Sequence, residues 1–297
     1  MAMDPKRDTA YARSVLKDLP LDMIISDLDG TLLSPGGTVD DVVIEAVGRL
    51  LQAGFRMAIA SGRIKASVLE IMEKLGIQEP YISCGGAYIA DPANGHVLLH
   101  QVFDRGTVEK IVFLARQSRV AVLFEEPERM TLEGSDEVSR ELDKMAGMHI
   151  PRVDDFFVEC TTLPTKIVLI GEADVLQALD PVLEAMEDEI HIASTFTTLR
   201  DVTPAGMSKG NGLQLLSDYI GIPTKRMLVI GDGWNDKSMF DLAAAGVAVA
   251  NATPNVLEAA DLIAPKNTEH GVAWVIDQLL ASRDTAGRAD SPGEPTS

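Results

Sequence analysis

Short apolar runs of strand length alternate with longer amphipathic stretches over the first part of the chain. In the longer stretches apolar residues recur every three or four positions, which is the period of a helix. The predicted elements are strand 22–26, helix 38–53, strand 55–60, helix 64–75 and a strand near 81–83. Alternation of this kind is typical of a parallel sheet covered by helices. We therefore expect residues 21–87 to form the first part of an α/β core.

The pattern changes after about residue 88, where strand pairs occur beside single helices. The predicted strands are His96–Val102, Val120–Phe124, Arg129–Leu132, 165–170 and 190–196, and the predicted helices are 105–118, 135–147 and 174–188. Strand pairs of this kind indicate a mostly antiparallel sheet. Residues 88–196 are therefore expected to form a separate α+β unit.

The parallel pattern resumes from Lys209. The predicted elements are helix 209–220, strand 226–231, helix 235–245, strand 247–249, helix 254–259, strand 261–263 and helix 270–281. Residues 197–281 are thus expected to be the second part of the α/β core, with the α+β unit inserted between the two parts.

The two ends of the chain carry weaker patterns. Residues 1–20 are polar and then weakly amphipathic, so we expect a loose extension with room for a short helix at its end. Residues 282–297 are rich in Ser, Asp, Gly and Pro without periodicity, a composition that predicts a disordered tail.

Composition narrows the class of protein. The 297 residues are 46% apolar, which is enough for one large or two ordinary packed domains. A formal net charge of -19 argues against nucleic acid and anionic membranes as partners. We also expect no signal peptide and no membrane span, because the first twenty residues are charged and no run of 18 apolar residues occurs. Two distant cysteines, Cys84 and Cys160, fit a reducing cytoplasm.

Asp27 and Asp29 follow the first buried strand and lead into a glycine turn at Gly30. Open α/β sheets bind their ligands at the carboxyl ends of strands. Two carboxylates this close repel each other unless a cation lies between them or one holds a proton. A hard divalent ion such as Mg²⁺ is a natural partner, although an acidic hairpin would have the same sequence.

Three further polar motifs stand at strand ends or helix starts. Ser61 and Gly62 follow the second strand and offer a hydroxyl and free backbone N–H groups to an anion, or a simple helix cap. Lys209 stands at a helix start, where its charge opposes the helix dipole unless it binds an anion. The run Gly231-Asp232-Gly233-Trp234-Asn235-Asp236 follows another buried strand and adds two acids, or a turn before a capped helix.

Together these four motifs resemble the haloacid dehalogenase superfamily. The later segments Ala245–Ala252, Ala260-Asp261 and His270-Gly271-Val272 are similar to the closing signature of its Cof-type hydrolases, so the resemblance covers roughly residues 22–281. It implies a Rossmann-like three-layer core with a parallel sheet and an inserted α+β cap domain of type IIB. Gly85-Gly86-Ala87 departs from the Asn-Gly-Ala of many relatives. The neighbouring Cys84 is expected to be a small buried side chain.

The resemblance also implies an activity and a role for each site residue. The activity is hydrolysis of small phosphomonoesters, dependent on Mg²⁺, through an aspartyl-phosphate intermediate. Asp27 would be the nucleophile, and Asp29 the general acid and base. Mg²⁺ would be held by Asp27, the backbone carbonyl of Asp29, and Asp232, with Asp236 at the metal waters. Phosphate would be bound by Ser61, Gly62, Lys209 and Asn235.

Other functions share parts of this pattern. A phosphomutase uses the same aspartyl-phosphate chemistry and is the closest rival, whereas a sugar-phosphate-binding regulator would not need both aspartates. A receiver domain needs only one small domain, and a dehalogenase does not need the second aspartate. The resemblance implies small phosphorylated metabolites as substrates, including sugar phosphates, pyridoxal phosphate and flavin mononucleotide. Some cap or near-cap side chains could meet the leaving group, but each also fits an ordinary surface role: Arg63, Glu125, Glu126, His149 and His191.

Overall fold

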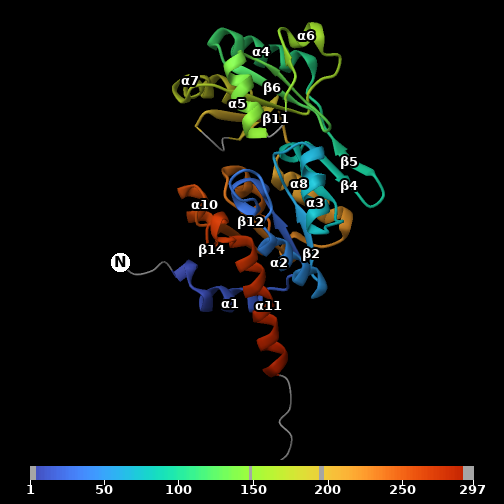
Figure 1. The fold of residues 1–297 in the computed structure, drawn as a ribbon, viewed down its shortest axis with the longest axis vertical. Helices are drawn as coiled ribbons and strands as arrows, with labels where there is room; N and C mark the ends of the chain where they lie inside the picture. Colours follow the sequence, from blue (N-terminus) through green and yellow to red (C-terminus); the bar gives the residue numbers. More distant parts are fainter. Residues whose placement is uncertain (1–4, 147–148, 194–196, 290–297) are drawn as a thin grey trace, which may run out of the picture.

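The computed structural model describes residues 5–146, 149–193 and 197–289, which form two parts (Figure 1). In Figure 1 the lower part is the core and the upper part is the inserted cap. Among the residues that the structure describes, no helix is long and apolar enough to cross a membrane. The ends of predicted helix 135–147 and strand 190–196, and the outermost residues of both predicted extensions, lie outside the described residues.

A five-stranded parallel sheet forms the centre of the core. Its strands run in the order β14 (Leu262–Ala264), β13 (Ala245–Val249), β12 (Met227–Gly231), β1 (Met23–Ser26) and β2 (Arg56–Ile59). β1 pairs in parallel with both β12 and β2, so segments about 200 residues apart in sequence are direct neighbours. The predicted parallel sheet is therefore confirmed.

Alternate residues of the central strand feed two different hydrophobic layers, as the pleat of a strand requires. Ile24 packs with α2 (Asp41–Gln52), α3 (Lys65–Leu75) and α11 (Gly271–Ala289) on one face. Met23 and Ile25 pack on the other face with α8 (Lys209–Ile220), α9 (Lys237–Phe240) and α10 (Pro254–Ala259). The core is a three-layer α/β/α sandwich, as expected. One helix is shorter than predicted, because the chain of 235–245 leaves α9 after Phe240 and starts β13 at Ala245.

The cap is built on a six-stranded sheet that is antiparallel except for its last pair. The strands run in the order β10 (Ile190–Ala193), β11 (Leu199–Pro204), β9 (Lys166–Ile170), β6 (Ala121–Glu125), β7 (Met130–Glu133) and β8 (Arg152–Val153). Helices α4 (Arg105–Ser118), α6 (Phe156–Glu159) and α7 (Ala173–Glu184) cover one face. α5 (Asp136–Ala146) packs on the other face through Val138 and Leu142. The predicted α+β unit is therefore present.

Both boundaries of the cap lie further along the chain than expected. β4 (Tyr88–Asp91) and β5 (His96–His100) pair with β3 (Tyr81–Ser83), and Ile89 packs in the core with Ile82. β11, predicted as neither strand nor cap, pairs with β9 inside the cap sheet. The charged Arg200 and Asp201 interrupt the apolar pattern of β11, which is why no strand was predicted there.

The N-terminal segment carries the short helix expected near its end, but from residue 5 onward it is packed on the core rather than loose. It contains α1 (Thr9–Asp18), whose Ala12 and Leu16 are fully buried in the core cluster that also contains α11. These two positions are four residues apart, so they lie on one face of the helix. Figure 1 shows α1 and α11 together at the base of the core.

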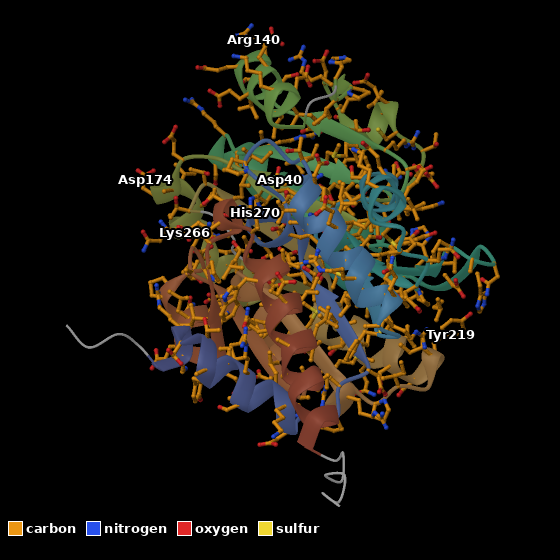
Figure 2. All side chains as sticks on the ribbon, turned by 60° about the horizontal axis from the view of Figure 1, so that its bottom comes forward. Asp40, Arg140, Asp174, Tyr219, Lys266 and His270 are labelled. Carbon is orange, nitrogen blue, oxygen red and sulfur yellow. The ribbon has the colours of Figure 1, made fainter. Side chains whose placement is uncertain are left out.

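Residues 282–289 of the predicted disordered tail are helical, because α11 continues to Ala289, and residues 290–297 lie outside the described residues. Ser282 is buried, and the Arg283 guanidinium donates to the carbonyls of Lys17 and Leu19 at the end of α1. This contact with α1 extends the helix past residue 281. Figure 2 shows the side chains, with Arg140 of α5 and Tyr219 of α8 on distant parts of the molecule.

If α1 is an integral part of the core, Leu16→Ala will destabilise the protein. We expect the free energy of unfolding to fall by about 3 kcal/mol, because the truncation leaves a cavity between α1 and α11. Urea unfolding measures this. Lys17→Ala, an exposed change on the same helix, should alter stability by less than about 0.5 kcal/mol. Equal stability of the two variants would mean that α1 contributes little to the core.

Candidate active site

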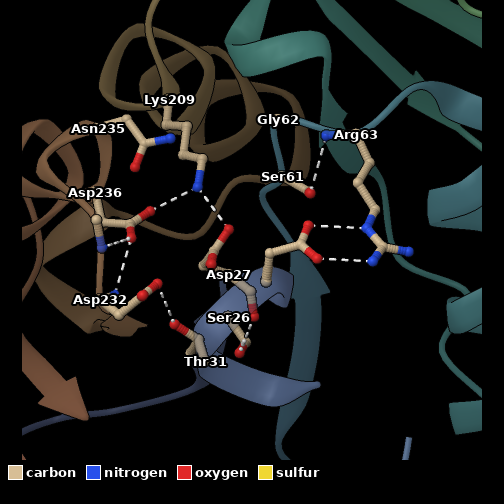
Figure 3. A network of polar contacts seen from close by, with 12 residues as sticks. Ser26, Asp27, Thr31, Ser61, Gly62, Arg63, Lys209, Asp232, Asn235 and Asp236 are labelled. Atoms are coloured by element: carbon tan, nitrogen blue, oxygen red, sulfur yellow. Dashed lines mark hydrogen bonds and ion pairs between the residues drawn. The ribbon is translucent and has the colours of Figure 1, made fainter. Parts of the chain in front are cut away.

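The candidate site lies where three neighbouring parallel strands of the core end. Asp27 follows β1 directly, Ser61 comes two residues after β2, and Asp232 follows β12. Because β2, β1 and β12 are adjacent and parallel, their carboxyl ends meet at one edge of the sheet. Lys209 begins α8 and reaches the same edge (Figure 3).

Lys209 joins two of the acids in a buried network. Its Nζ lies 2.6 Å from Asp27 Oδ1 and 2.7 Å from Asp236 Oδ1, and all three side chains are almost completely buried. Burial alone would lower the pKa of Lys209, but the charges of Asp236 and Asp27 raise it, so the ammonium stays charged. A permanently charged donor is thereby fixed beside the Asp27 carboxylate.

Asp27, Asp232 and Asp236 form a cluster in which one carboxylate oxygen from each lies within 4.8 Å of the other two. Burial raises the pKa of Asp27 well above its usual range, and Asp236 and Asp232 add to this against the opposing charge of Lys209. Burial, together with Asp236, raises the pKa of Asp232 to about 6. A cluster that resists ionisation in the absence of a cation fits a hard divalent ion with oxygen ligands. These acids could therefore hold a metal.

Asp236 and Asp232 differ in how many of their carboxylate oxygens are already hydrogen-bonded. Asp236 Oδ1 faces Lys209, and its Oδ2 accepts from the backbone N–H groups of Asp232 and Gly233 at 3.1 and 2.9 Å. Asp232 Oδ1 accepts from the Thr31 hydroxyl at 3.0 Å. Both oxygens of Asp236 are thus already engaged, which leaves Asp27 and Asp232 as the more available oxygen ligands.

Gly30 lets the turn after Asp27 approach the side chain of Asp232 closely. Its φ is +77°, and a Cβ atom there would lie 2.3 Å from Oδ2 of Asp232. The Gly30 carbonyl accepts from Nδ2 of Asn251 at 2.7 Å, and Oδ1 of Asn251 accepts from the backbone N–H of Asn267 at 2.9 Å. Asn251 lies in the segment Ala245–Ala252, so part of the closing signature supports the turn that carries Asp29.

The same scaffold reaches the start of α11. Asn267 Nδ2 donates to the Leu33 carbonyl at 2.9 Å, and Nδ1 of His270 lies 3.4 Å from Oδ2 of Asp40. In Figure 2, Asp40, His270 and Lys266 lie near one another at the helix ends of the core. The His270 motif therefore lies beside Asp40 and outside the acidic cluster.

The Asp29 side chain is separate from the acidic cluster. It forms a two-pronged ion pair with Arg63, at 2.8 Å from Nε and 2.7 Å from the second guanidinium nitrogen, and is 50% exposed. The prediction that the backbone carbonyl of Asp29 binds the metal stays a prediction. From the sequence, Arg63 was predicted only as a candidate contact for a leaving group. Its position directly after Ser61 and Gly62 also indicates a place in the site itself.

The remaining predicted phosphate ligands surround a narrow cavity between core and cap. Gly62, Gly85, Ser208, Lys209 and Asn235 line it from the core, and Lys166, His191, Ala193, Asp201 and Thr203 line it from the cap. Ser61 is fully buried beside it, and its Oγ accepts from the Arg63 backbone N–H at 3.1 Å (Figure 3). Because a hydroxyl can accept and donate at once, the Ser61 proton stays free for an anion.

Cys84 is a buried structural side chain, as expected. Burial raises the pKa of its thiol to about 12, so little reactive thiolate exists at neutral pH. The chemistry of the site therefore depends on carboxylates, a hydroxyl and a lysine.

The chain is similar to known hydrolases and phosphatases. The family model of haloacid dehalogenase-like hydrolases matches residues 24–276. A 5-amino-6-(5-phospho-D-ribitylamino)uracil phosphatase of Bacillus subtilis is 28% identical over 285 residues, covering 88% of this chain and 98% of its own. A second phosphatase of Bacillus subtilis is 27% identical and covers 87% of this chain and 99% of its own.

Solved structures show the same fold. A haloacid dehalogenase-like hydrolase from Bacteroides thetaiotaomicron superposes with a TM-score of 0.78 at 26% identity, covering 87% of this chain and 99% of its own. A sugar phosphatase of subclass IIB gives a TM-score of 0.77 at 24% identity, covering 86% and 98% of the two chains. Since the family model spans both parts of the core and the inserted cap, the chain belongs to the haloacid dehalogenase-like hydrolases.

Proposed function

We propose that the protein is a Mg²⁺-dependent phosphatase that hydrolyses small phosphomonoesters through an aspartyl-phosphate on Asp27. The main support for this proposal is the buried contact of Lys209 with Asp27, in a cluster that also contains Asp232 and Asp236. The phosphatase names of the relatives support this proposal. The two cysteines are free and fit a cytoplasmic enzyme.

Asp27, Asp232 and the backbone carbonyl of Asp29 are the groups that would hold the ion, with Asp236 aligning its waters. When bound, Mg²⁺ would reduce the repulsion between the Asp27 carboxylate and a phosphate dianion. Lys209, the Ser61 hydroxyl and nearby N–H groups would bind the phosphate oxygens, and Asn235 would orient them. The oxygen preference of the acids favours Mg²⁺ over zinc, because none of the three is Cys or His.

The reaction would proceed in two displacements at phosphorus. A carboxylate oxygen of Asp27 bonds to phosphorus while the ester P–O bond breaks, and Asp29 gives its proton to the leaving alkoxide. A water then attacks the aspartyl-phosphate, Asp29 takes up the proton of that water, and phosphate leaves with Asp27 regenerated. In the structure Asp29 is paired with Arg63, so this ion pair must open and Asp29 must take a proton from water before it can protonate the leaving group.

The cap is proposed to select the ester. The groups that would handle phosphate lie outside the cap sheet, whereas His191, Asp201 and Thr203 of the cap line the cavity next to Lys209. A leaving group that projects away from Asp27 would meet these residues, and its binding energy would help to order and desolvate the phosphate.

Asp27→Asn should abolish turnover and leave the fold intact, because the change removes the nucleophile and almost no volume. We expect kcat for p-nitrophenyl phosphate to fall by more than about 1,000-fold. The melting temperature should stay within about 3 °C of that of the wild type. Asp41→Asn, at an exposed acid in α2, is the matched control and should leave kcat unchanged. Near-normal kcat in Asp27→Asn would exclude Asp27 as the nucleophile.

Activity should disappear on dialysis against EDTA and return with added Mg²⁺. Asp232→Ala should raise the Mg²⁺ concentration for half-maximal activity by at least about tenfold, because it removes an available oxygen ligand. Steady-state rates across a Mg²⁺ titration measure this. Full activity after exhaustive dialysis would contradict the proposed dependence on a metal.

Mg²⁺ binding should weaken at acidic pH. The pKa of Asp232 is raised to about 6, so this group is protonated below pH 6 in the metal-free protein and must lose its proton to bind the ion. We expect the dissociation constant of Mg²⁺ to rise by about tenfold between pH 6 and pH 5. Calorimetric titration at several pH values tests this, and equal affinity from pH 5 to pH 7 would refute it.

A further inference from the structure

A lysine of the cap reaches into the core beside the site. Lys166, the first residue of β9, has only 5% of its side chain exposed. Its Nζ donates to the backbone carbonyl of Gly62 at 2.8 Å. Gly62 stands between Ser61 and Arg63, so this bond joins the cap to the loop that faces the phosphate.

The backbone carbonyls of the loop Ser61–Arg63 each accept a hydrogen bond from a different donor. The Ser61 carbonyl accepts from the backbone N–H of Gly85 at 3.1 Å, and the Arg63 carbonyl accepts from that of Cys84 at 2.9 Å. Both donors belong to the core, whereas the carbonyl between them is held by Lys166 of the cap. The orientation of the Gly62–Arg63 peptide therefore depends on the cap.

That peptide controls two site residues. Its carbonyl and its N–H point in opposite directions, because the peptide is planar and trans. The N–H belongs to Arg63 and donates to Ser61 Oγ at 3.1 Å, which keeps the Ser61 proton free for a phosphate oxygen. The side chain of the same Arg63 holds both oxygens of Asp29.

Two cap carboxylates hold the lysine in place. Nζ of Lys166 lies 2.9 Å from Asp201 Oδ1 and 3.0 Å from Glu125 Oε2. Burial alone would lower the pKa of Lys166, but Asp201 and Glu125 raise it, so the ammonium stays charged while it donates to the Gly62 carbonyl and forms ion pairs with both carboxylates. Glu125 Oε2 is buried and accepts no hydrogen bond of good geometry. Burying such a cluster gives little stability compared with apolar packing, so a role in function explains it better.

We propose that Lys166 is a positioning residue, through which the seated cap orients the Ser61 hydroxyl and the Arg63–Asp29 pair. This role rests on the proposed phosphatase function and extends it to a residue outside the core motifs. Lys166 would act on phosphate binding through Ser61 and on the general acid Asp29 through Arg63. Its loss should therefore reduce the rate equally for every leaving group.

Lys166→Met keeps the length of the side chain and removes its charge and donors. We expect kcat/KM to fall by about 30-fold for both p-nitrophenyl phosphate and glucose 6-phosphate, about 2 kcal/mol of transition-state stabilisation. The inhibition constant of inorganic phosphate should rise by at least about tenfold, which a purely structural role would not produce. Circular-dichroism melts establish that the variant is folded.

Lys65→Met is the matched control. Lys65 of α3 forms an ion pair with Glu128 between the core and the cap, but does not contact the phosphate loop. Its loss should change kcat/KM by less than about twofold. Lys166→Met leaves two buried carboxylates unpaired and could unfold for that reason alone. In that case both carboxylates are first neutralised in the double variant Glu125→Gln/Asp201→Asn. The triple variant that adds Lys166→Met is then compared with this double variant, so that the two proteins differ only at the lysine.

The outcomes separate the two proposals. If a folded Lys166→Met protein keeps kcat/KM within about threefold of the wild type, or loses activity on one ester only with unchanged phosphate inhibition, the positioning role is wrong. If the wild type hydrolyses no phosphate ester with Mg²⁺, the proposed function fails and the positioning role fails with it.

Discussion

The site depends on one buried ammonium, that of Lys209, held between Asp27 and Asp236. Three acids packed this closely would repel one another, and burial raises the pKa of Asp27 and Asp232 even with the lysine present. The fold must therefore bring Lys209 to the same point as acids that are far away in the sequence. A parallel sheet does this, because β1 lies between β2 and β12 and the polar residues follow the strands at one edge.

A second layer of contacts holds the turn after Asp27. Asn251 donates to the Gly30 carbonyl, the backbone N–H of Asn267 donates to Asn251, and His270, just before α11, lies 3.4 Å from Asp40. Asn251 and His270 belong to the closing signature of the chain, whereas Asn267 lies between its segments, and Asn251 contacts the first turn rather than the phosphate cavity. These contacts support the backbone of the turn that carries Asp29, whose side chain pairs with Arg63.

The insertion of the cap separates two tasks in one chain. The core carries the groups proposed to act on phosphate, and the cap lines the cavity from the other side with His191, Asp201 and Thr203. The contact of Lys166 with Gly62 means that this separation is incomplete, since a cap residue also sets the geometry of the phosphate loop. In the proposed function, selection of an ester and competence to cleave it would thereby be linked through one hydrogen bond.

Hydrophobic periodicity along the sequence was enough to predict most of the helices and strands. It placed helices 105–118 and 209–220 within their observed bounds, and it put the acids at strand ends, because both signals are local and repeat along the chain. It missed β11, whose Arg200 and Asp201 hide the apolar pattern, and it missed the packing of α1, since periodicity gives a buried face but not its partner. The pairing of Asp29 with Arg63 and the reach of Lys166 to Gly62 were decided only by the tertiary structure, because each joins residues that are distant in sequence and meet only when separate elements pack together.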